Sequence, residues 1–170
     1  YSASGELIAR YLILLRHGKA EDSHPAGDFE RELVERGIQQ ARRAGRLLAA
    51  LDRLPDVVLT SPRIRAKQTA EHFCEAGGMP GPVSQPWIDC GMRPEEALHE
   101  LKAFTEFGRV MLVGHEPDFS GLVEWVLDTS GSVNVKKGSL IGLVVSPPSR
   151  GGQLLYNVPP QMMAAKKARR

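Results

Sequence analysis

The sequence predicts an α/β fold, a three-layer α/β/α sandwich with a mostly parallel central sheet and antiparallel edge strands. Three short apolar segments, 11–15, 56–60 and 109–113, are each followed by a segment with helical periodicity. Such alternation is typical of parallel strands that are covered by helices on both faces. Near the C-terminus, two strand-like segments separated by prolines and glycines predict a closing hairpin.

The first half of the chain contains two strand–helix units. A polar loop from residue 19 to about 30 follows the first strand. Apolar residues three or four positions apart then predict a long amphipathic helix: Leu33, Val34, Ile38, Ala41, Ala44, Leu48 and Leu51. After the second strand, Ser61 is expected to cap a helix that has Pro62 at its first position and ends at Gly77-Gly78.

The second half continues this alternation and then changes to the hairpin. The elements expected there are, in order, a short strand near 83–88, a helix opened by Pro94, a buried strand at 109–113, a helix opened by Pro117, and strands at 139–146 and 153–158. We expect one domain over residues 1–160 and a basic, disordered tail over residues 161–170.

The composition is that of an ordinary globular protein. The 170 residues are 42% hydrophobic and 25% charged, which excludes the disordered, collagen-like and disulfide-rich classes. Lysine and arginine number 22 against 20 acidic residues. Four of these cations lie in the last five residues, so the rest of the chain is slightly acidic and we expect no nucleic-acid partner.

Location and assembly follow from what the sequence lacks. No apolar run approaches the roughly 20 residues of a membrane span, and no signal-peptide pattern is visible at the N-terminus. Cys74 and Cys90 are isolated thiols, which fits a reducing compartment. We therefore expect a cytoplasmic protein without a membrane partner. The sequence does not determine the oligomeric state, and a monomer is the simplest expectation.

Polar residues that could bind an anion follow all three apolar strands. Arg16 and His17 follow the first, Arg65 lies just beyond the second, and His115 follows the third. In open α/β sheets, ligands bind outside the carboxyl ends of the strands. These motifs contain no carboxylate to neutralise the cations, and arginine suits bidentate binding of phosphate oxygens. The sequence therefore predicts a phosphate site that contains a histidine nucleophile.

Four motifs carry a resemblance to a known family. They are Arg-His-Gly at 16–18, an Asp-x-x-Arg-x-Leu-x-x-x-Gly stretch at 28–37, Ser-Pro-Arg-Ile-Arg-Ala-Lys-Gln-Thr-Ala at 61–70, and Gly-His-Glu-Pro at 114–117. Together they resemble the motifs of the histidine phosphatase (phosphoglycerate-mutase-like) superfamily. The short chain and the His-Glu-Pro form are similar to the small SixA-like phosphohistidine phosphatases in particular.

The resemblance implies a role for each matching residue. His17 would be the nucleophile and would carry the phosphoryl group as a phosphohistidine intermediate. Arg63 falls at a variable position of its motif and receives no role. The residues implied to hold the phosphoryl group are Arg16, Gly18, Arg31, Arg65 and His115.

The chemistry of these residues agrees with those roles. An attacking imidazole nitrogen must be unprotonated, and neighbouring arginines lower the pKa of His17 from its ordinary value of about 6.5. Fixed positive charge stabilises the transition state of phosphoryl transfer. The arrangement requires no metal and no cofactor.

The identity of a general acid is the open point. Asp89, Glu95 and Glu21 are candidates, of which Asp89 is nearest to the position where related phosphatases carry an acid. A phosphohistidine substrate needs an acid least, because imidazole leaves far more easily than an alkoxide. The weak acid motif therefore favours a phosphohistidine substrate.

The function expected from these observations is that of a metal-independent phosphohistidine phosphatase. Its partner would be a phosphorylated protein, such as a phosphotransfer domain, or a small phosphorylated substrate. Two alternatives stay open. One is a broader small-molecule phosphomonoesterase or mutase of the same superfamily, and the other is a module that binds phosphoprotein without turnover.

Overall fold

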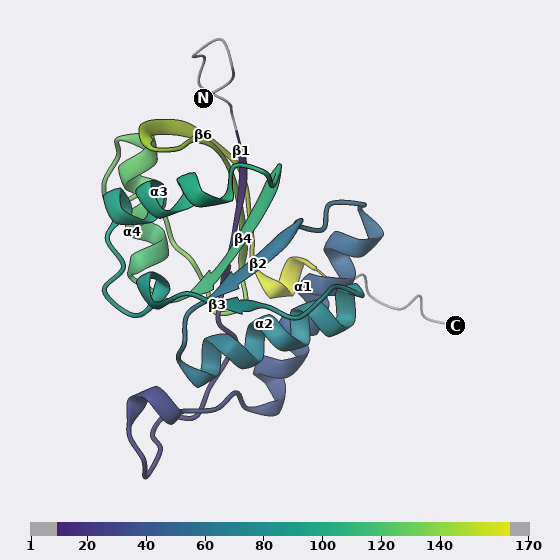
Figure 1. Cartoon of the computed structure of the whole chain (residues 1–170). Helices are drawn as coiled ribbons and strands as arrows, with labels where there is room; N and C mark the ends of the chain where they lie inside the picture. Colours follow the sequence, from purple (N-terminus) through teal and green to yellow (C-terminus); the bar gives the residue numbers. More distant parts are fainter. Residues whose placement is uncertain (1–9, 164–170) are drawn as a thin grey trace.

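A six-stranded sheet forms the centre of the molecule, with the strand order β3-β2-β4-β1-β5-β6. The computed structural model describes residues 10–163 (Figure 1). The strands are β1 (Arg10–Arg16), β2 (Val57–Thr60), β3 (Val83–Ser84), β4 (Arg109–Gly114), β5 (Leu140–Ser146) and β6 (Ser149–Val158). The first four run parallel, whereas β5 and β6 are antiparallel to their neighbours. The predicted sheet, with its hairpin at one edge, is confirmed.

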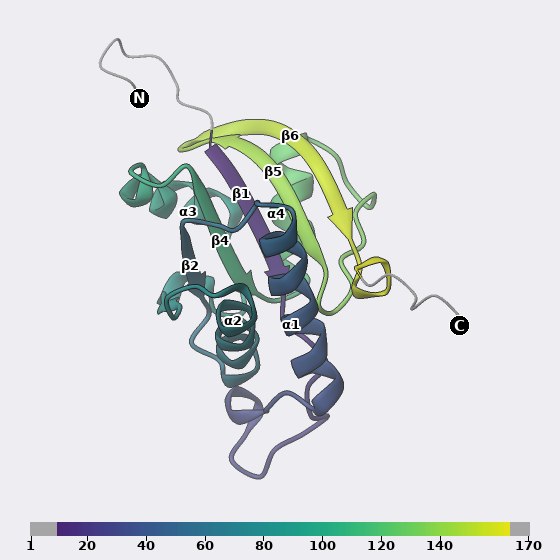
Figure 2. The same ribbon diagram turned by 90° about the vertical axis from the view of Figure 1, so that its right-hand side faces the viewer.

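Two pairs of helices cover the two faces of this sheet. Helices α1 (Glu35–Ala50) and α2 (Ile64–Gly77) pack on one face, and α3 (Pro94–Leu101) and α4 (Asp118–Leu127) pack on the other (Figures 1 and 2). This is the predicted three-layer architecture. Short 3₁₀ helices complete the described chain: η1 (Asp28–Glu30), η2 (Pro86–Ile88), η3 (Lys102–Phe104) and η4 (Pro160–Met162).

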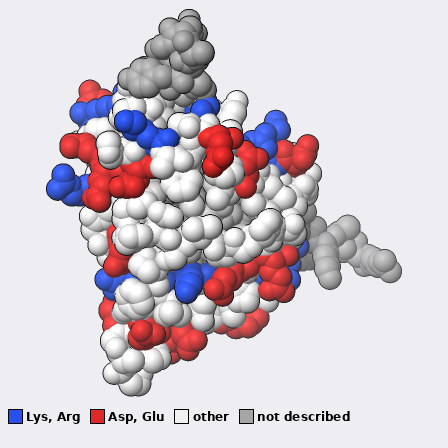
Figure 3. Space-filling model, viewed as in Figure 1, with Lys and Arg blue, Asp and Glu red and all other residues white. Residues whose placement is uncertain are grey.

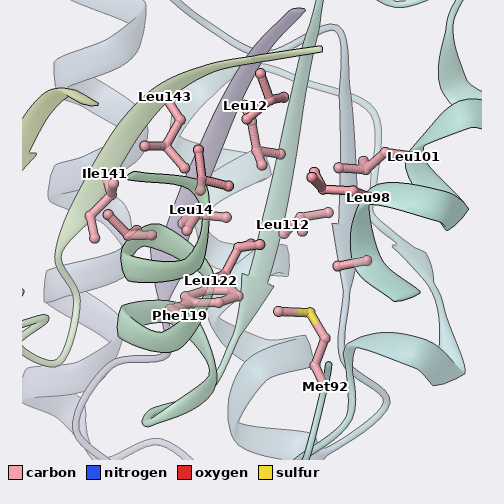
Figure 4. Packing of buried hydrophobic residues seen from close by; sticks show 14 of the residues in the cluster. Leu12, Leu14, Met92, Leu98, Leu101, Leu112, Phe119, Leu122, Ile141 and Leu143 are labelled. Atoms are coloured by element: carbon pink, nitrogen blue, oxygen red, sulfur yellow. The ribbon is translucent and has the colours of Figure 1, made fainter. Parts of the chain in front are cut away.

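Strand β1 shows why its sequence is continuously apolar. Leu12 and Leu14 belong to the core cluster beneath α3 and α4, where Figure 4 shows Leu14 near Leu122. Alternate residues of the same strand pack under α1 and α2 instead. A strand that is buried on both faces needs apolar side chains at every position.

Two predicted boundaries are wrong. Helix α2 begins at Ile64 and not at Pro62, although the Ser61 hydroxyl still accepts a hydrogen bond of 3.3 Å from the Arg63 N–H. The strand expected near 83–88 ends at Ser84, and η2 follows it. Proline at position 86 has no N–H to donate to a neighbouring strand, which explains the early end.

The hairpin also differs from the expectation. Its turn is Pro147-Pro148, as predicted, but β6 begins at Ser149 and contains the Gly-Gly pair that was expected to lie between the strands. A Cβ atom at Gly152 would collide with the carbonyl oxygen of Val144 on β5. Glycine is therefore part of the close pairing of these strands.

The packed chain reaches Met163, three residues beyond the predicted domain boundary at 160. Pro160 is buried in η4, and Met163 packs against the core cluster beneath α1 and α2. Residues 164–170, with the lysines and arginines of the predicted tail, lie outside the described residues. None of the helices within residues 10–163 combines the length and the hydropathy that a membrane-spanning helix requires. On the face drawn in Figure 3, acidic and basic side chains are interspersed.

Candidate active site

The ends of β1 and β4 bring two histidines together. Arg16 and Gly114 are paired across the two parallel strands, and the His17 N–H donates to the Gly114 carbonyl at 3.0 Å. His17 directly follows Arg16, and His115 directly follows Gly114. The centroids of the two histidine rings are 5.4 Å apart. The sheet register thus joins two of the predicted site residues, which lie almost 100 positions apart in sequence.

His17 has the form required of a nucleophile. Its side chain is only 6% exposed, and Nδ1 lies 2.8 Å from the Gly18 carbonyl oxygen. A carbonyl can only accept, so Nδ1 carries the proton and Nε2 keeps its lone pair. Burial is the largest cause that lowers the pKa of His17 to about 3, and the charges of His115, Arg65 and Arg16 lower it further against the opposing Gly18 hydrogen bond. The predicted direction is confirmed, but burial contributes more than the arginines.

His115 is held by a residue that the sequence did not single out for the site. The His115 side chain is 2% exposed, and its Nε2 lies 2.7 Å from the Ser61 hydroxyl. Burial lowers the pKa of His115 to about 4, and the nearby charges of Arg65 and Arg63 act in the same direction. His115 is therefore neutral at pH 7, like His17.

His17, His115, Arg16 and Arg65 are called the histidine cluster below, because the charges of the other three act on His17. Three of its buried nitrogen atoms lack hydrogen-bond partners among the described residues. They are Nε of Arg16, Nε of Arg65 and Nδ1 of His115. Burying a polar nitrogen without a partner costs about 1–3 kcal/mol, more for a charged group. Two of the three belong to guanidinium groups, which suit phosphoryl oxygens. The donor set therefore fits an anion.

Gly18 allows the loop after β1 to lie against the start of α1. A Cβ atom at position 18 would approach the Cα of Gly37 to 2.8 Å. The Gly18 N–H donates to the Thr69 hydroxyl at 3.1 Å. Gly18 therefore allows close packing beside the cluster, and its N–H already donates to Thr69.

The expectation that no carboxylate neutralises the arginines is wrong. The Asp28 carboxylate accepts hydrogen bonds from Nη1 of Arg31 at 2.9 Å, Nη1 of Arg63 at 2.5 Å and Nη2 of Arg65 at 3.3 Å. The hydrogen bond from Arg31 is the largest cause that holds the pKa of Asp28 below its usual value. Asp28 belongs to one of the quoted motifs, but only the fold brings its loop over the start of α2.

Arg31 lies at the edge of this cluster. Its Nε donates to the Glu21 carbonyl at 2.6 Å, and its Nη1 pairs with the Asp28 carboxylate. The bond to Glu21 ties the two sides of the loop before α1 together. The structure thus places Arg31 near Arg65 through their shared carboxylate.

Asp89 lies beside His115, but its carboxylate is occupied. Arg63 Nε donates to Oδ1 of Asp89 at 2.6 Å. Burial acts to raise the pKa of Asp89, but the hydrogen bonds from Arg63 and the Cys90 N–H, with the charge of Arg63, leave it below its ordinary value. An ionised carboxylate has no proton to donate, so this geometry does not favour Asp89 as a general acid.

The other two candidates for the acid are also placed. Glu21 accepts a hydrogen bond from the Glu32 N–H at 2.7 Å. Glu95 is exposed in the first turn of α3. Neither shares a hydrogen bond or ion pair with the histidine cluster among residues 10–163.

One group of possible metal ligands overlaps the cluster. Atoms of Asp89, Cys90 and His115 lie within 4.8 Å of one another. Asp89 is already paired with Arg63, and burial raises the pKa of the Cys90 thiol. A protonated thiol beside arginines is a poor cation ligand, so this donor set fits a metal badly.

Comparison with known proteins identifies the family. Residues 12–92 match the model of the histidine phosphatase superfamily (branch 1). The chain is 33% identical over 141 residues to an uncharacterized protein of Picosynechococcus sp., covering 78% of this chain and 83% of that protein. The chain belongs to the histidine phosphatase superfamily.

Solved structures in this superfamily share the fold. The protein histidine phosphatase SixA complexed with tungstate superposes with a TM-score of 0.81 at 21% identity, over 89% of this chain and 97% of that one. The protein assigned as phosphohistidine phosphatase SixA in Agrobacterium tumefaciens gives a TM-score of 0.74 at 28% identity, over 89% and 98%. At 21% identity the first likeness shows the fold alone.

This histidine phosphatase superfamily member also has site residues that the sequence analysis missed. The sequence predicts only a helix cap at Ser61 and no role for Arg63, whereas the structure joins Ser61 to His115 and Arg63 to Asp28 and Asp89. Cys90 Sγ lies 3.7 Å from Nη2 of Arg65. Asp28 and Ser61 both belong to the motifs of the sequence, so the motifs could have indicated that these residues lie at the site. The spacing of the motifs does not indicate which arginine or histidine each residue contacts.

Proposed function

We propose that this protein is a phosphohistidine phosphatase that works through a phosphoryl-enzyme intermediate on His17. The observation that carries the proposal is the state of the His17 ring, which is buried, neutral, and fixed by Gly18 so that Nε2 keeps its lone pair. A module that only binds phosphate needs its arginines but not a histidine held in this form.

The proposed reaction has two displacements. The lone pair on Nε2 of His17 forms a bond to phosphorus, and the P–N bond of the substrate breaks. The substrate imidazole leaves neutral after taking one proton from solvent. Water then attacks the phosphoryl group, the bond to Nε2 breaks, and inorganic phosphate is released with the histidine regenerated.

Arg16, Arg65 and His115 are proposed to hold the phosphoryl oxygens during both steps. Their unpartnered nitrogens supply three donors. Ser61 accepts a hydrogen bond from the Arg63 N–H and can donate its own proton to Nε2 of His115. The tautomer that we propose for the reaction then has the His115 proton on Nδ1. Fixed donors of this kind stabilise the charge of the transition state.

The state of Asp89 favours phosphohistidine over an alcohol phosphate. Asp89 is ionised and bonded to Arg63, so the leaving group must depart without its help. Imidazole, with an ordinary pKa near 6.5, leaves readily under these conditions. We propose a phosphorylated protein, such as a phosphotransfer domain, as the cytoplasmic partner of a monomeric enzyme.

A rapid-quench experiment tests the nucleophile. The protein is mixed with a ³²P-labelled phosphohistidine protein and quenched in base, which preserves phosphohistidine. The wild type is expected to trap label, and His17→Ala is expected to trap none and to release no phosphate. Label on the His17→Ala variant, or binding without phosphate release by the wild type, would contradict the mechanism.

A substrate panel with a chelator tests substrate class and metal independence. Phosphohistidine protein is compared with sugar and alcohol phosphates, each with and without EDTA. We expect the phosphohistidine protein to have the higher kcat/KM and the rates to be unchanged by EDTA, because arginine and histidine supply the positive charge and donors. Faster turnover of the esters would favour the phosphomonoesterase, and loss of activity in EDTA would refute the metal-free step.

A further inference from the structure

A basic groove lies between α1, the loop before β5, and η4. Its volume is about 550 Å³. Figure 2 shows η4 beside α1, and a Cβ at Gly138 would touch both Gln40 of α1 and Pro160 of η4. The cationic residues that line the groove, and that define it below, are Arg16, Lys19, Arg36, Arg43, Lys136 and Lys137.

The basic groove has no direct acidic partner within the described residues, and the charge of Glu116 acts on Arg16 from outside it. No aspartate or glutamate lines it, and none of its six cations forms an ion pair with any residue from 10 to 163. By contrast, Arg63 and Arg65 share the carboxylate of Asp28. Clefts lined by one sign of charge concentrate ions of the opposite sign. The groove therefore favours an anion.

The spread of the charges indicates how many anionic groups it can bind. Arg36 and Arg43 are seven residues apart in α1, which places them two turns or roughly 10 Å apart along the helix axis. The amides of Gln39 and Gln40 line the groove between them. A single phosphoryl group cannot reach both ends, whereas a ligand with several such groups can.

The remaining lining residues limit the class of ligand. Among them there is no aromatic side chain on which a base could stack, and no large aliphatic side chain for a lipid tail. The volume lies within the roughly 300–1,000 Å³ of small-molecule sites. A concave site of this size is better filled by a compact ligand than by the surface of a folded protein.

We propose that the basic groove binds a compact polyanion with several phosphoryl groups, such as an oligophosphate chain or a multiply phosphorylated polyol. Arg16 connects this site to the cluster, because it lines the groove and its charge also acts on His17. A ligand in the groove would therefore compete for Arg16 with a phosphoryl group at His17. The proposal goes beyond the proposed function, since binding here requires no turnover.

Titration calorimetry on the full chain tests the site, with His17→Asn as the background to prevent hydrolysis. Tripolyphosphate and inositol hexakisphosphate are the two probes, and orthophosphate reports binding at the cluster. Arg36→Glu with Lys137→Glu reverses two exposed cations of the groove. Arg53→Glu with Lys102→Glu makes the same change in charge at exposed positions that do not line it.

We expect the groove variant to bind at least one probe ten or more times more weakly, with orthophosphate affinity changed less than threefold. The control variant should bind the same probe within threefold of the background protein, because charges beyond about 8 Å are screened at physiological salt. Tighter binding of tripolyphosphate indicates a linear chain, and tighter binding of the inositol compound indicates a polyol.

Three results would overturn the proposal. One is that neither probe binds at micromolar concentration. Another is an equal loss in both variants, which would mean a general charge effect. The third is tighter binding of a single-stranded oligonucleotide than of either probe. Because the measurement uses a protein without His17, its outcome is independent of whether the phosphatase proposal holds.

Discussion

At the scale of single residues, the site depends on two neutral histidines that are held in different ways. His17 donates through Nδ1 to a backbone carbonyl, and His115 is anchored by the Ser61 hydroxyl. Burial keeps both rings unprotonated at pH 7 by lowering their pKa values. The bond to a backbone carbonyl fixes the tautomer of His17 and cannot be removed by substitution. The orientation of His115, by contrast, depends on a side chain that can be removed.

The role of Ser61 is therefore a test at this scale. Ser61→Ala removes the hydroxyl that lies 2.7 Å from His115 Nε2. We expect kcat/KM toward phosphohistidine protein to fall about tenfold, which corresponds to roughly 1.4 kcal/mol, the net contribution of one hydrogen bond. Ser120→Ala, in the first turn of α4, is the control and should retain the wild-type rate. An unchanged rate for Ser61→Ala would show that His115 is oriented without it.

At the scale of elements, the loop after β1 and helix α1 approach each other more closely than side chains allow. A Cβ at Gly37 in the first turn of α1 would collide with the Lys19 carbonyl oxygen and lie 2.8 Å from the Lys19 nitrogen. Both atoms belong to the backbone and cannot rotate away. Glycine is unfavourable inside a helix compared with alanine, but packing beside the cluster requires it at position 37.

Gly37→Ala is expected to destabilise the protein. The added methyl forces the loop and the helix apart, which we expect to lower the free energy of unfolding by about 1–3 kcal/mol. Gly121→Ala in α4 is the matched control, because nothing lies within 4 Å of its Cβ position. That change should be neutral or raise the free energy of unfolding by up to about 1 kcal/mol. Urea denaturation measures both, and equal effects would contradict the packing argument.

At the scale of the whole molecule, the fold must keep two imidazoles neutral against their tendency to gain protons. In the unfolded chain a histidine has a pKa of about 6.5. In the folded protein the pKa values of His17 and His115 are about 3 and about 4. Between these values and pH 6.5 the unfolded state binds more protons, so stability increases with pH in this range.

Acidification should therefore destabilise the protein before its carboxylates are protonated. We expect the free energy of unfolding, measured in urea, to fall as the pH decreases from 6.5 to 4.5. The double variant His17→Asn with His115→Asn should show a shallower fall over the same range. His99→Asn, which replaces an exposed histidine on α3, should keep the wild-type slope. A double variant with an undiminished slope would mean that other groups cause the loss.

Much of the fold could be predicted because its strands and helices are local patterns. Segment 109–113 is apolar throughout and forms β4, and Pro94 opens α3 as expected. The errors lie at boundaries such as the start of α2 and the early end of β3. At these positions a nearby proline and the pairing with neighbouring strands together decide where the element begins or ends. These outcomes depend on contacts that the local sequence does not contain.

By itself, the sequence determined the order of the elements, the family motifs and the polar residues that follow the strand ends. Only the tertiary structure decided that Asp28 reaches three arginines, that Ser61 holds His115, and that Asp89 is bonded to Arg63. The physical reason is that each of the contacts to Arg63, Arg65 and His115 joins segments more than 25 residues apart. Such pairings, and the burial that neutralises both histidines, are set by sheet register and packing and by no local pattern.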